Sequence, residues 1–259
     1  MHVVVITKST PDTAAKVSVN AEGQVGWGES MVINPWDEYA VTEAVLIKEA
    51  HNAKATVMTL GAEAHAEALK QGLAIGCDAA VRVWDAGLHP EDSLQYSRAM
   101  AAAVQKLDDV QLVIFGKEFA DLGSDQHVYQ VGRKLGWTVL GSVAKILALD
   151  FEAKTIQVER WLEQGTQVVK APLPAVVSVL KDINEPKYPS FMGIRKAAKA
   201  DIPVWDATAL GVDVGSPATQ ILSYENPPQK SGAVTMIEGD SPASLAENLA
   251  NKLMEDKVL

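Results

Sequence analysis

The sequence predicts an α/β protein: a doubly wound, mostly parallel sheet with added antiparallel strands and a C-terminal arm. Short continuous apolar runs alternate with segments that carry apolar residues at helical spacing. Such runs are typical of strands buried on both faces of a parallel sheet. After residue 142 they give way to alternating apolar and polar residues, which is the pattern of antiparallel strands.

The first half of the chain repeats a strand followed by a helix. The expected strands are 3–6, 55–60, 80–84 and 110–115, and the expected helices are 37–49, 64–75, 90–106 and one that ends near 135. Gly76 directly follows the second helix and is a suitable C-cap, because glycine accepts left-handed backbone angles. Right-handed crossovers between such strands place helices on both faces of the sheet.

The second half predicts further strands and then a long arm. The alternating segments, expected to join the main sheet as antiparallel strands, are 143–149, 155–161, 166–169 and 175–180. Beyond residue 181 the chain is rich in Pro and Lys and has no clean period until a helix at 242–254. Long aperiodic segments are uncommon in self-contained domains. We therefore predict an α/β domain over 1–200, and an arm over 201–259 that packs on a partner subunit.

Composition restricts the partners and the compartment. The formal net charge of −10 argues against nucleic acid or an anionic membrane as partner, since both attract clustered positive charge. No apolar run approaches the ~18 residues of a membrane helix. Cys77 is the single cysteine and lies in an apolar context, so we expect a buried, unreactive thiol in a reducing compartment. Met1 leads directly into a strand with no presequence, and the expected location is cytoplasmic.

Ligands of open parallel sheets bind beyond the carboxyl ends of the strands, here after Ile6, Leu60 and Phe115. The loop 116–126 is the best candidate, because its glycines let backbone approach a phosphate and a helix N-terminus follows. The alternative is that Ser124 or Asp125 only caps that helix.

The segment Asn-Pro-Trp-Asp-Glu at 34–38 also allows two interpretations. It either begins a helix or presents the amide of Asn34 to a nucleotide.

Five histidines are scattered without metal-ligand spacing, and His127 is expected at the surface. The chain has no P-loop and no hydrolase signature. The sequence therefore predicts no catalytic residues.

Three blocks together resemble the beta subunit of electron transfer flavoproteins. Residues 34–44, Asn-Pro-Trp-Asp-Glu-Tyr-Ala-Val-Thr-Glu-Ala, look like the family's Asn-Pro, acidic residue, Ala-Val-x-Glu-Ala segment. Residues 180–199 are similar to its Asn-(Glu or Lys)-Pro-Arg-Tyr followed by Ile-x-x-Ala. Residues 116–137 resemble its nucleotide loop and the next helix, which ends in Leu-x-Trp. Residues 5–8 and 210–212 also fall where the family has Val-Ala-Val-Lys and Leu-Gly-Val.

The resemblance implies a Rossmann-like, adenine nucleotide alpha hydrolase-like fold and a heterodimer with an alpha subunit that holds most of the FAD. This chain would be a non-catalytic electron carrier with a structural AMP site and a docking loop for flavin-dependent dehydrogenases. By position, the nucleotide would contact Ile6, Asn34, Pro35, Trp36, Asp37, Leu60, Asp121, Gly123, Ser124, Asp125, Gln126, His127, Val128, Gln130, Val131 and Gly132. The docking loop would comprise Asn184, Glu185, Pro186, Tyr188, Phe191, Met192 and Ile194.

The nucleotide loop departs from the family pattern. Family members commonly have Gln-Thr-Gly-Gln or Gln-Val-Gly where this chain has Gln126-His127-Val128-Tyr129. A branched side chain in place of glycine restricts approach to phosphates. Thr13 stands where some members place a tyrosine near the flavin. Two alternatives stay open: a bifurcating-type subunit with a second FAD in this chain, and a stand-alone adenine nucleotide sensor or hydrolase on the same type of sheet.

Overall fold

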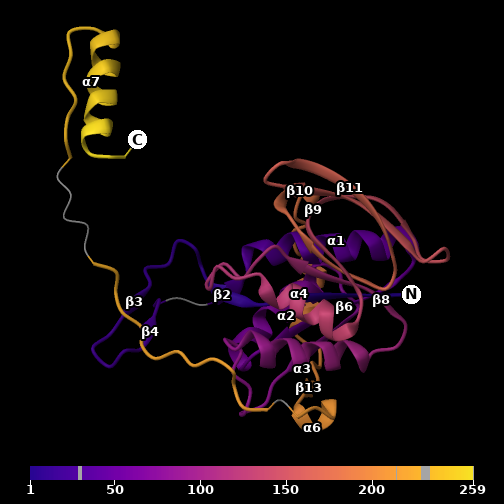
Figure 1. Ribbon diagram of the computed structural model, residues 1–259. Coiled ribbons are helices and arrows are strands. Elements are labelled where there is room, and N and C mark those ends of the chain that lie inside the picture. The colour runs from indigo at the N-terminus through magenta and orange to yellow at the C-terminus, as the bar shows by residue number, and fades with distance from the viewer. Residues whose placement is uncertain (29–30, 214, 229–233, 259) are drawn as a thin grey trace. The chain divides into compact units, whose positions relative to one another are not determined.

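The computed structural model describes residues 1–28, 31–213, 215–228 and 234–258, which form two compact units, Met1–Tyr224 and Glu225–Leu259. The larger unit holds a nine-stranded sheet with helices on both faces (Figure 1). The smaller unit contains the helix α7 (Pro242–Glu255), which begins at a capping box formed by Ser241 and Ser244. The predicted fold class is confirmed.

The sheet is parallel through its centre and antiparallel at one edge. Its order is β11-β10-β9-β12-β8-β1-β6-β7-β13. The parallel strands are β1 (His2–Thr7), β6 (Lys54–Leu60), β7 (Ala79–Val83), β8 (Val110–Gly116), β9 (Thr138–Asp150), β12 (Ala175–Val179) and β13 (Val204–Trp205). The antiparallel strands are β10 (Thr155–Leu162) and β11 (Gly165–Pro172).

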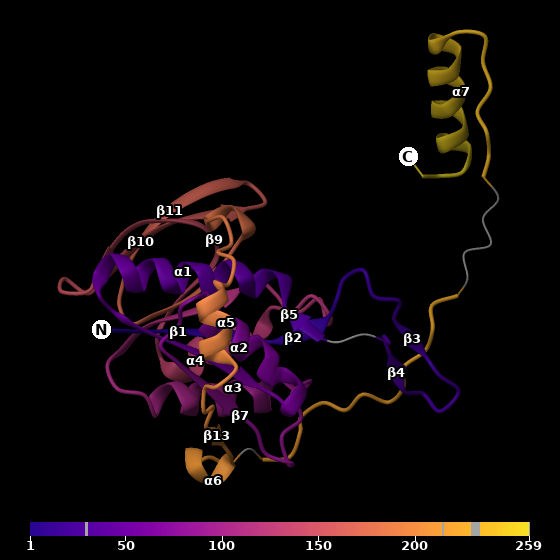
Figure 2. The same cartoon turned by 180° about the vertical axis from the view of Figure 1, so that it is seen from behind.

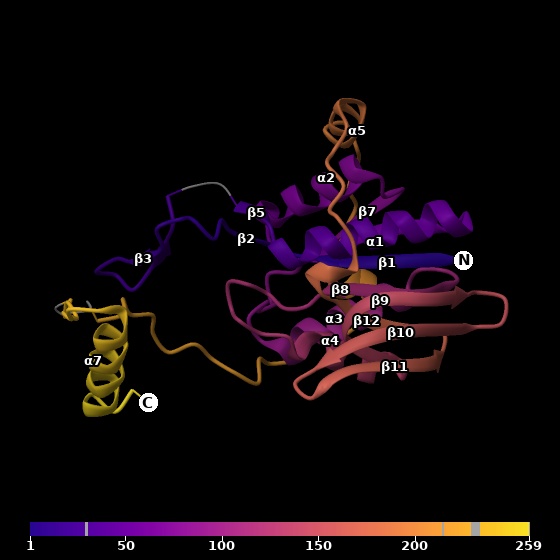
Figure 3. The same cartoon turned by 90° about the horizontal axis from the view of Figure 1, so that it is seen from above.

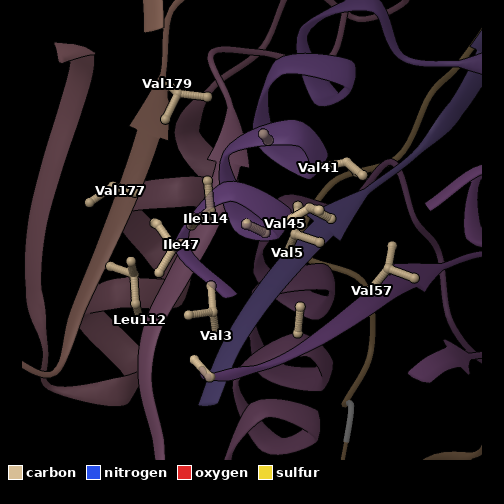
Figure 4. Close-up of a cluster of buried hydrophobic side chains, with 14 of the residues drawn as sticks. Val3, Val5, Val41, Val45, Ile47, Val57, Leu112, Ile114, Val177 and Val179 are labelled. Carbon is tan, nitrogen blue, oxygen red and sulfur yellow. The ribbon is translucent and has the colours of Figure 1, made fainter. Parts of the chain in front are cut away.

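Helices bury both faces of β1, which explains its uninterrupted apolar run. The helices are α1 (Pro35–His51), α2 (Ala66–Ile75), α3 (Ser93–Gln105) and α4 (Gln126–Leu135). Val3 and Val5 belong to one cluster with Val41 of α1 (Figure 4), and α2 covers the same face. Val4 and Ile6 point to the opposite face, into a cluster with residues of α3 and α4. Figure 1 shows α1 on one side of the sheet and α3 on the other, and Figure 3 looks down on the strands, with β10 and β11 side by side.

The chain reverses direction across the sheet at β1. β1 pairs with β6 on one side and with β8 on the other. The chain therefore adds β6 and β7 on one side of β1 and then crosses to the other side to add β8. Ligands of open α/β sheets bind at such a switch point, outside the carboxyl ends of the strands. The loops that follow β1, β6 and β8 meet there, as the sequence predicts.

One expectation about the sheet is wrong. The segment 175–180 was expected as an appended antiparallel strand, but β12 lies between β8 and β9 and is parallel to both. All five of its residues are buried, because helices cover the sheet on both sides here. β9 also begins at Thr138, several residues before the predicted start.

Several short elements lack a sequence signal. They are the strands β2 (Ser9–Pro11), β3 (Ser18–Val19), β4 (Val25–Gly26) and β5 (Met31–Ile33), the 3₁₀ turns η1 (Glu63–His65) and η2 (Lys181–Ile183), and the helices α5 (Phe191–Ala197) and α6 (Ala207–Leu210). β2 pairs with β5 and β3 with β4. β13 pairs with β7, so the sheet continues past residue 200, and the compact unit ends at Tyr224. Packing of the remaining arm on a partner stays a prediction.

Candidate functional site

A cavity of about 660 Å³ lies at the carboxyl edge of the sheet, and we call it the edge cavity. Lys8 lines it from the end of β1, His65 from the segment after β6, and Asp121 from the loop after β8. Thr13 and Trp27, from the segment between β2 and β5, close another side. The cavity has the size of small-molecule sites in general.

Asn34 fastens the loop after β8. It is fully buried, its Nδ2 donates to the carbonyl of Glu118 at 2.9 Å, and its Oδ1 accepts the N–H of Ala120 at 3.1 Å. The side-chain amide thus bonds to the loop and positions it, while contact of Asn34 with a nucleotide stays a prediction. Gly116 is required at the base of this loop, since a Cβ there would lie 2.7 Å from the backbone of Trp36.

Asp37, in the first turn of α1, is buried against the end of β1. Its carboxylate accepts the N–H of Lys8 at 2.8 Å. Burial raises the pKa of Asp37 to about 7, against hydrogen bonds from Asn34, Lys8 and Gly116 that favour the charged form. Pro35 occupies the start of the helix, and Trp36 lies beneath the ammonium group of Lys117 at 5.1 Å. This segment therefore begins α1 and joins it to two strand ends.

The shifted pKa predicts a pH dependence of stability. Between about pH 4 and pH 7 the folded chain keeps a proton on Asp37 that the unfolded chain has lost. The free energy of unfolding should therefore fall as pH rises through this range, by up to ~1.4 kcal/mol per pH unit. Asp37→Asn does not titrate, so its stability relative to the wild type should increase from about pH 5 to pH 7 and then level off. Urea denaturation across this range measures the difference. The exposed Asp201→Asn is the control for losing one charge, and a constant difference between Asp37→Asn and wild type would contradict the prediction.

Lys8 contributes a positive charge to the lining of the edge cavity. Its ammonium pairs with Asp121 at 2.6 Å and lies 5.0 Å from the ring centroid of Phe119. His65 accepts the N–H of Ser9 on Nδ1 at 3.3 Å. Burial and the positive charge of Lys8 lower the pKa of His65 to about 4, so the imidazole is neutral.

The residues predicted to bind a nucleotide are gathered at one edge, but most of them are packed together. Ile6, Leu60, Val128 and Val131 are at most 2% exposed and share one hydrophobic cluster. Gly132 packs so closely on β9 that a Cβ would lie 2.2 Å from Val139.

The loop residues of the same prediction have other roles. Gly123 takes positive φ in the turn where its N–H donates to the carbonyl of Phe119, and Asp125 is the N-cap of α4 without a side-chain cap bond. Gln130 has a buried Oε1 with no hydrogen-bond partner among the described residues. Ser124, Gln126 and His127 line a second cavity of about 180 Å³, which we call the inner cavity.

His127 is buried, and the prediction of a surface histidine is wrong. Its ring stacks on Phe119 with centroids 3.7 Å apart and an interplanar angle of 4°. Tyr96 and Phe115 contact it edge-on, at 5.6 and 5.5 Å. Burial, with the charge of Lys8, lowers the pKa of His127 to about 3. Sequence reasoning missed Phe119 and Tyr96: Phe119 lies within the candidate loop, but nothing in the sequence indicates Tyr96.

The predicted docking residues lie together and several are exposed. Tyr188 is 93% exposed, Phe191 73% and Met192 71%, while Ile194 of α5 is half-exposed. The base of the segment is fastened to α1, because Asn184 Nδ2 donates to the carboxylate of Glu43 at 2.8 Å. Between Asn184 and Tyr188, Glu185 is exposed and Pro186 is partly buried.

The close contact between α5 and α2 depends on a glycine. Figure 2 shows α5 beside α2, and Gly193 approaches so closely that a Cβ there would lie 2.2 Å from the carbonyl oxygen of Ala74. The exposed apolar side chains are thus carried by a segment held at a fixed place on the domain.

Cys77 is buried, which confirms the expected buried thiol, and burial raises its pKa to about 12. Within the ranges that the structure describes, no group of three His, Cys, Asp or Glu side chains could hold a metal ion. None of the described helices is long and apolar enough to span a bilayer.

Comparisons with known proteins assign the family. A family model described as electron transfer flavoprotein domain matches residues 28–210. Electron transfer flavoprotein subunit beta of Megasphaera elsdenii is 29% identical and aligns over 100% of both chains. Protein FixA of Azotobacter vinelandii is 31% identical over 98% of this chain and 94% of that protein. Subunit CarD of the caffeyl-CoA reductase-Etf complex of Acetobacterium woodii is 29% identical over 100% of both. The chain therefore belongs to the electron transfer flavoprotein family, among its beta-subunit-like members.

Proposed function

We propose that this chain is the beta subunit of a heterodimeric electron transfer flavoprotein. It takes electrons from flavin-dependent dehydrogenases and passes them to an acceptor through FAD held mainly by the alpha subunit. The observation that carries the proposal is the exposed apolar docking segment, fastened to α1 and α2. Large apolar side chains in such numbers on a surface mark a site of protein contact.

The edge cavity is the place where this chain would meet the flavin of its partner. Thr13 lines it, at the position where the family resemblance places a residue near the flavin. FAD, when bound, supplies the electron transfer itself, and the chain supplies shape and charge. Lys8 offers a positive charge that Asp121 holds in place, while the neutral His65 adds a polar edge.

The C-terminal unit is the proposed arm toward the alpha subunit. Leu245, Leu249 and Met254 of α7 are 38–57% exposed, and the helix buries no residue of its own. An amphipathic helix without a core needs a partner to cover its apolar side.

AMP is not part of the proposal, because the assigned residues do not fit it. The side chains of Ile6, Leu60 and Val128 are buried against other side chains of the core and are not available to contact a base. The amide of Asn34 is bound to the loop. The competing function, a stand-alone adenine nucleotide sensor or hydrolase, loses support for the same reason.

Co-expression with an electron transfer flavoprotein alpha subunit from the same organism tests the function. We expect a one-to-one complex that contains FAD, is reduced by a flavin-dependent dehydrogenase and is reoxidised by an acceptor. A chain that is monomeric in the presence of the alpha subunit would reject the proposal. Nucleotide turnover by the chain without any flavoprotein would favour the competing function.

Gly193 should be a positioning residue for docking. Gly193→Ala forces α5 away from Ala74, so we expect kcat/KM for reduction by a dehydrogenase that reduces the wild-type complex to fall about tenfold, or ~1.4 kcal/mol. Reduction by dithionite, which needs no docking, should not change. Gly26→Ala is the matched control, since no atom lies within 4 Å of its added Cβ. Equal effects on both reductants would argue against a docking role.

A further inference from the structure

We infer that this chain binds neither AMP nor a second FAD, because its own aromatic side chains fill the nucleotide site of the fold. The inference rests on the proposed function and makes it more specific: the heterodimer holds a single flavin and no other nucleotide. The filling group is the stacked pair of Phe119 and His127, which we call the aromatic plug.

The plug joins the two elements that would have to grip a nucleotide. Phe119 comes from the loop after β8, and His127 comes from the first turn of α4. The centroid distance of 3.7 Å is that of two stacked planar groups, so no base can be inserted between the rings. Phe119 is 4% exposed and His127 3%, and Tyr96 and Phe115 close the plug at its edges.

The floor beneath the plug is also filled. Ile6 and Leu60, at the ends of β1 and β6, are in the same cluster as Phe119, Val128 and Val131. The family resemblance places glycine where this chain has Val128, and Val128 is fully buried. The valine at 128 in place of glycine and the ring of His127 beside it thus act at one place.

The space that remains is too small for a nucleotide. The inner cavity, lined by the plug together with Ser124 and Gln126, measures about 180 Å³. Sites for small organic ligands usually start near ~300 Å³. The larger edge cavity is lined by only one of the residues that the resemblance assigns to the nucleotide, Asp121.

Charge around the plug also disfavours a phosphate. The nearby carboxylates are Glu91, at the rim of both cavities, Glu118, Asp121 and Asp125. Lys8 is paired with Asp121, and Lys117 lies 3.7 Å from Glu118. His127 stays neutral and adds no positive charge.

The filled nucleotide site predicts that this electron carrier does not bifurcate electron pairs. Splitting an electron pair within the heterodimer would need a second flavin in this chain. With the plug in place, the FAD of the alpha subunit is the single redox centre of the heterodimer, and electrons enter and leave through it.

Nucleotide content of the purified heterodimer tests the inference. After denaturation, chromatography should release one FAD and no AMP per heterodimer, and equilibrium dialysis of the intact complex with labelled AMP should detect no binding. One AMP or two FAD per heterodimer would overturn the inference and leave the proposed function intact. Absence of a complex with the alpha subunit, or of FAD in it, would reject the proposed function instead.

Removal of the plug supplies the reverse experiment. The double variant Phe119→Ala/His127→Thr should gain AMP binding, measured by the same dialysis. The matched control is Phe151→Ala/His51→Ala, which removes a Phe–His ring pair that does not involve His127, with centroids 5.3 Å apart, and should gain none. A folded plug variant that binds no AMP would show that the plug is not what excludes the nucleotide. If the plug variant fails to fold, the wild-type stoichiometry decides alone.

Discussion

Phe119→Ala should lower the free energy of unfolding of this chain by about 3–5 kcal/mol, the range expected when a large buried aromatic side chain is truncated. Phe119 is 4% exposed although it belongs to a loop, and its ring contacts His127, Tyr96 and the Lys8 ammonium. Truncation would therefore leave a void at the point where α3, α4 and the loop after β8 meet. Denaturant unfolding of the heterodimer and of the isolated chain measures the effect.

A second phenylalanine provides the comparison for stability. Phe191 is 73% exposed, so Phe191→Ala should change the free energy of unfolding by less than about 0.5 kcal/mol. A cost below about 1 kcal/mol for Phe119→Ala would mean that the loop collapses into the void, and that the plug contributes little to the folded state.

The sequence predicted the centre of the sheet because burial on both faces leaves an unmistakable apolar run. β1, β6, β7 and β8 lie within one residue of their predicted bounds. At 175–180, Ala-Val-Val-Ser-Val follows alternating segments, so the local pattern predicts an antiparallel strand where the structure has a parallel one. The local sequence of a hairpin does not reveal that the next strand will return to the middle of the sheet.

The location of the candidate site was predictable, but its side-chain packing was not. Parallel strands end at one edge, so the loops after Ile6, Leu60 and Phe115 had to meet there. Whether these loops leave a space between them depends on how the rings of Phe119 and His127, eight residues apart, are oriented. It also depends on the ring of Tyr96, which comes from another helix. No periodicity encodes such contacts. The departures of His127, Val128 and Tyr129 from the family pattern were the visible signs, in the sequence, of a different nucleotide loop.

The predicted docking segment shows the opposite situation, because the structure explains why the polar residues of its motif are needed. Asn184 and Lys187 anchor the segment to α1 through Glu43, Thr42 and Glu49. The polar residues of the motif therefore hold the backbone in place, and its large apolar side chains are exposed. A side chain held in place before docking loses less entropy on binding, which favours one exposed ring as an anchor.

Phe191→Ala should lower kcat/KM for reduction of the heterodimer by a flavin-dependent dehydrogenase about 30-fold, the equivalent of ~2 kcal/mol for an aromatic interface anchor. The reason is that its ring is exposed at the start of α5, with Met192 and Tyr188 around it and the Arg195 guanidinium 5.9 Å from its centroid. Stopped-flow reduction with a dehydrogenase that reduces the wild-type complex measures the loss, while dithionite reduction and FAD content should stay unchanged. Phe119→Ala, judged on the fraction that remains folded, should show the reverse pattern: reduced stability with near-normal kcat/KM. Normal reduction of Phe191→Ala by every dehydrogenase that reduces the wild type would place the docking surface elsewhere on the chain. Because the two phenylalanines differ in exposure and not in chemistry, the pair of variants separates the role of the plug in folding from the role of the segment in docking.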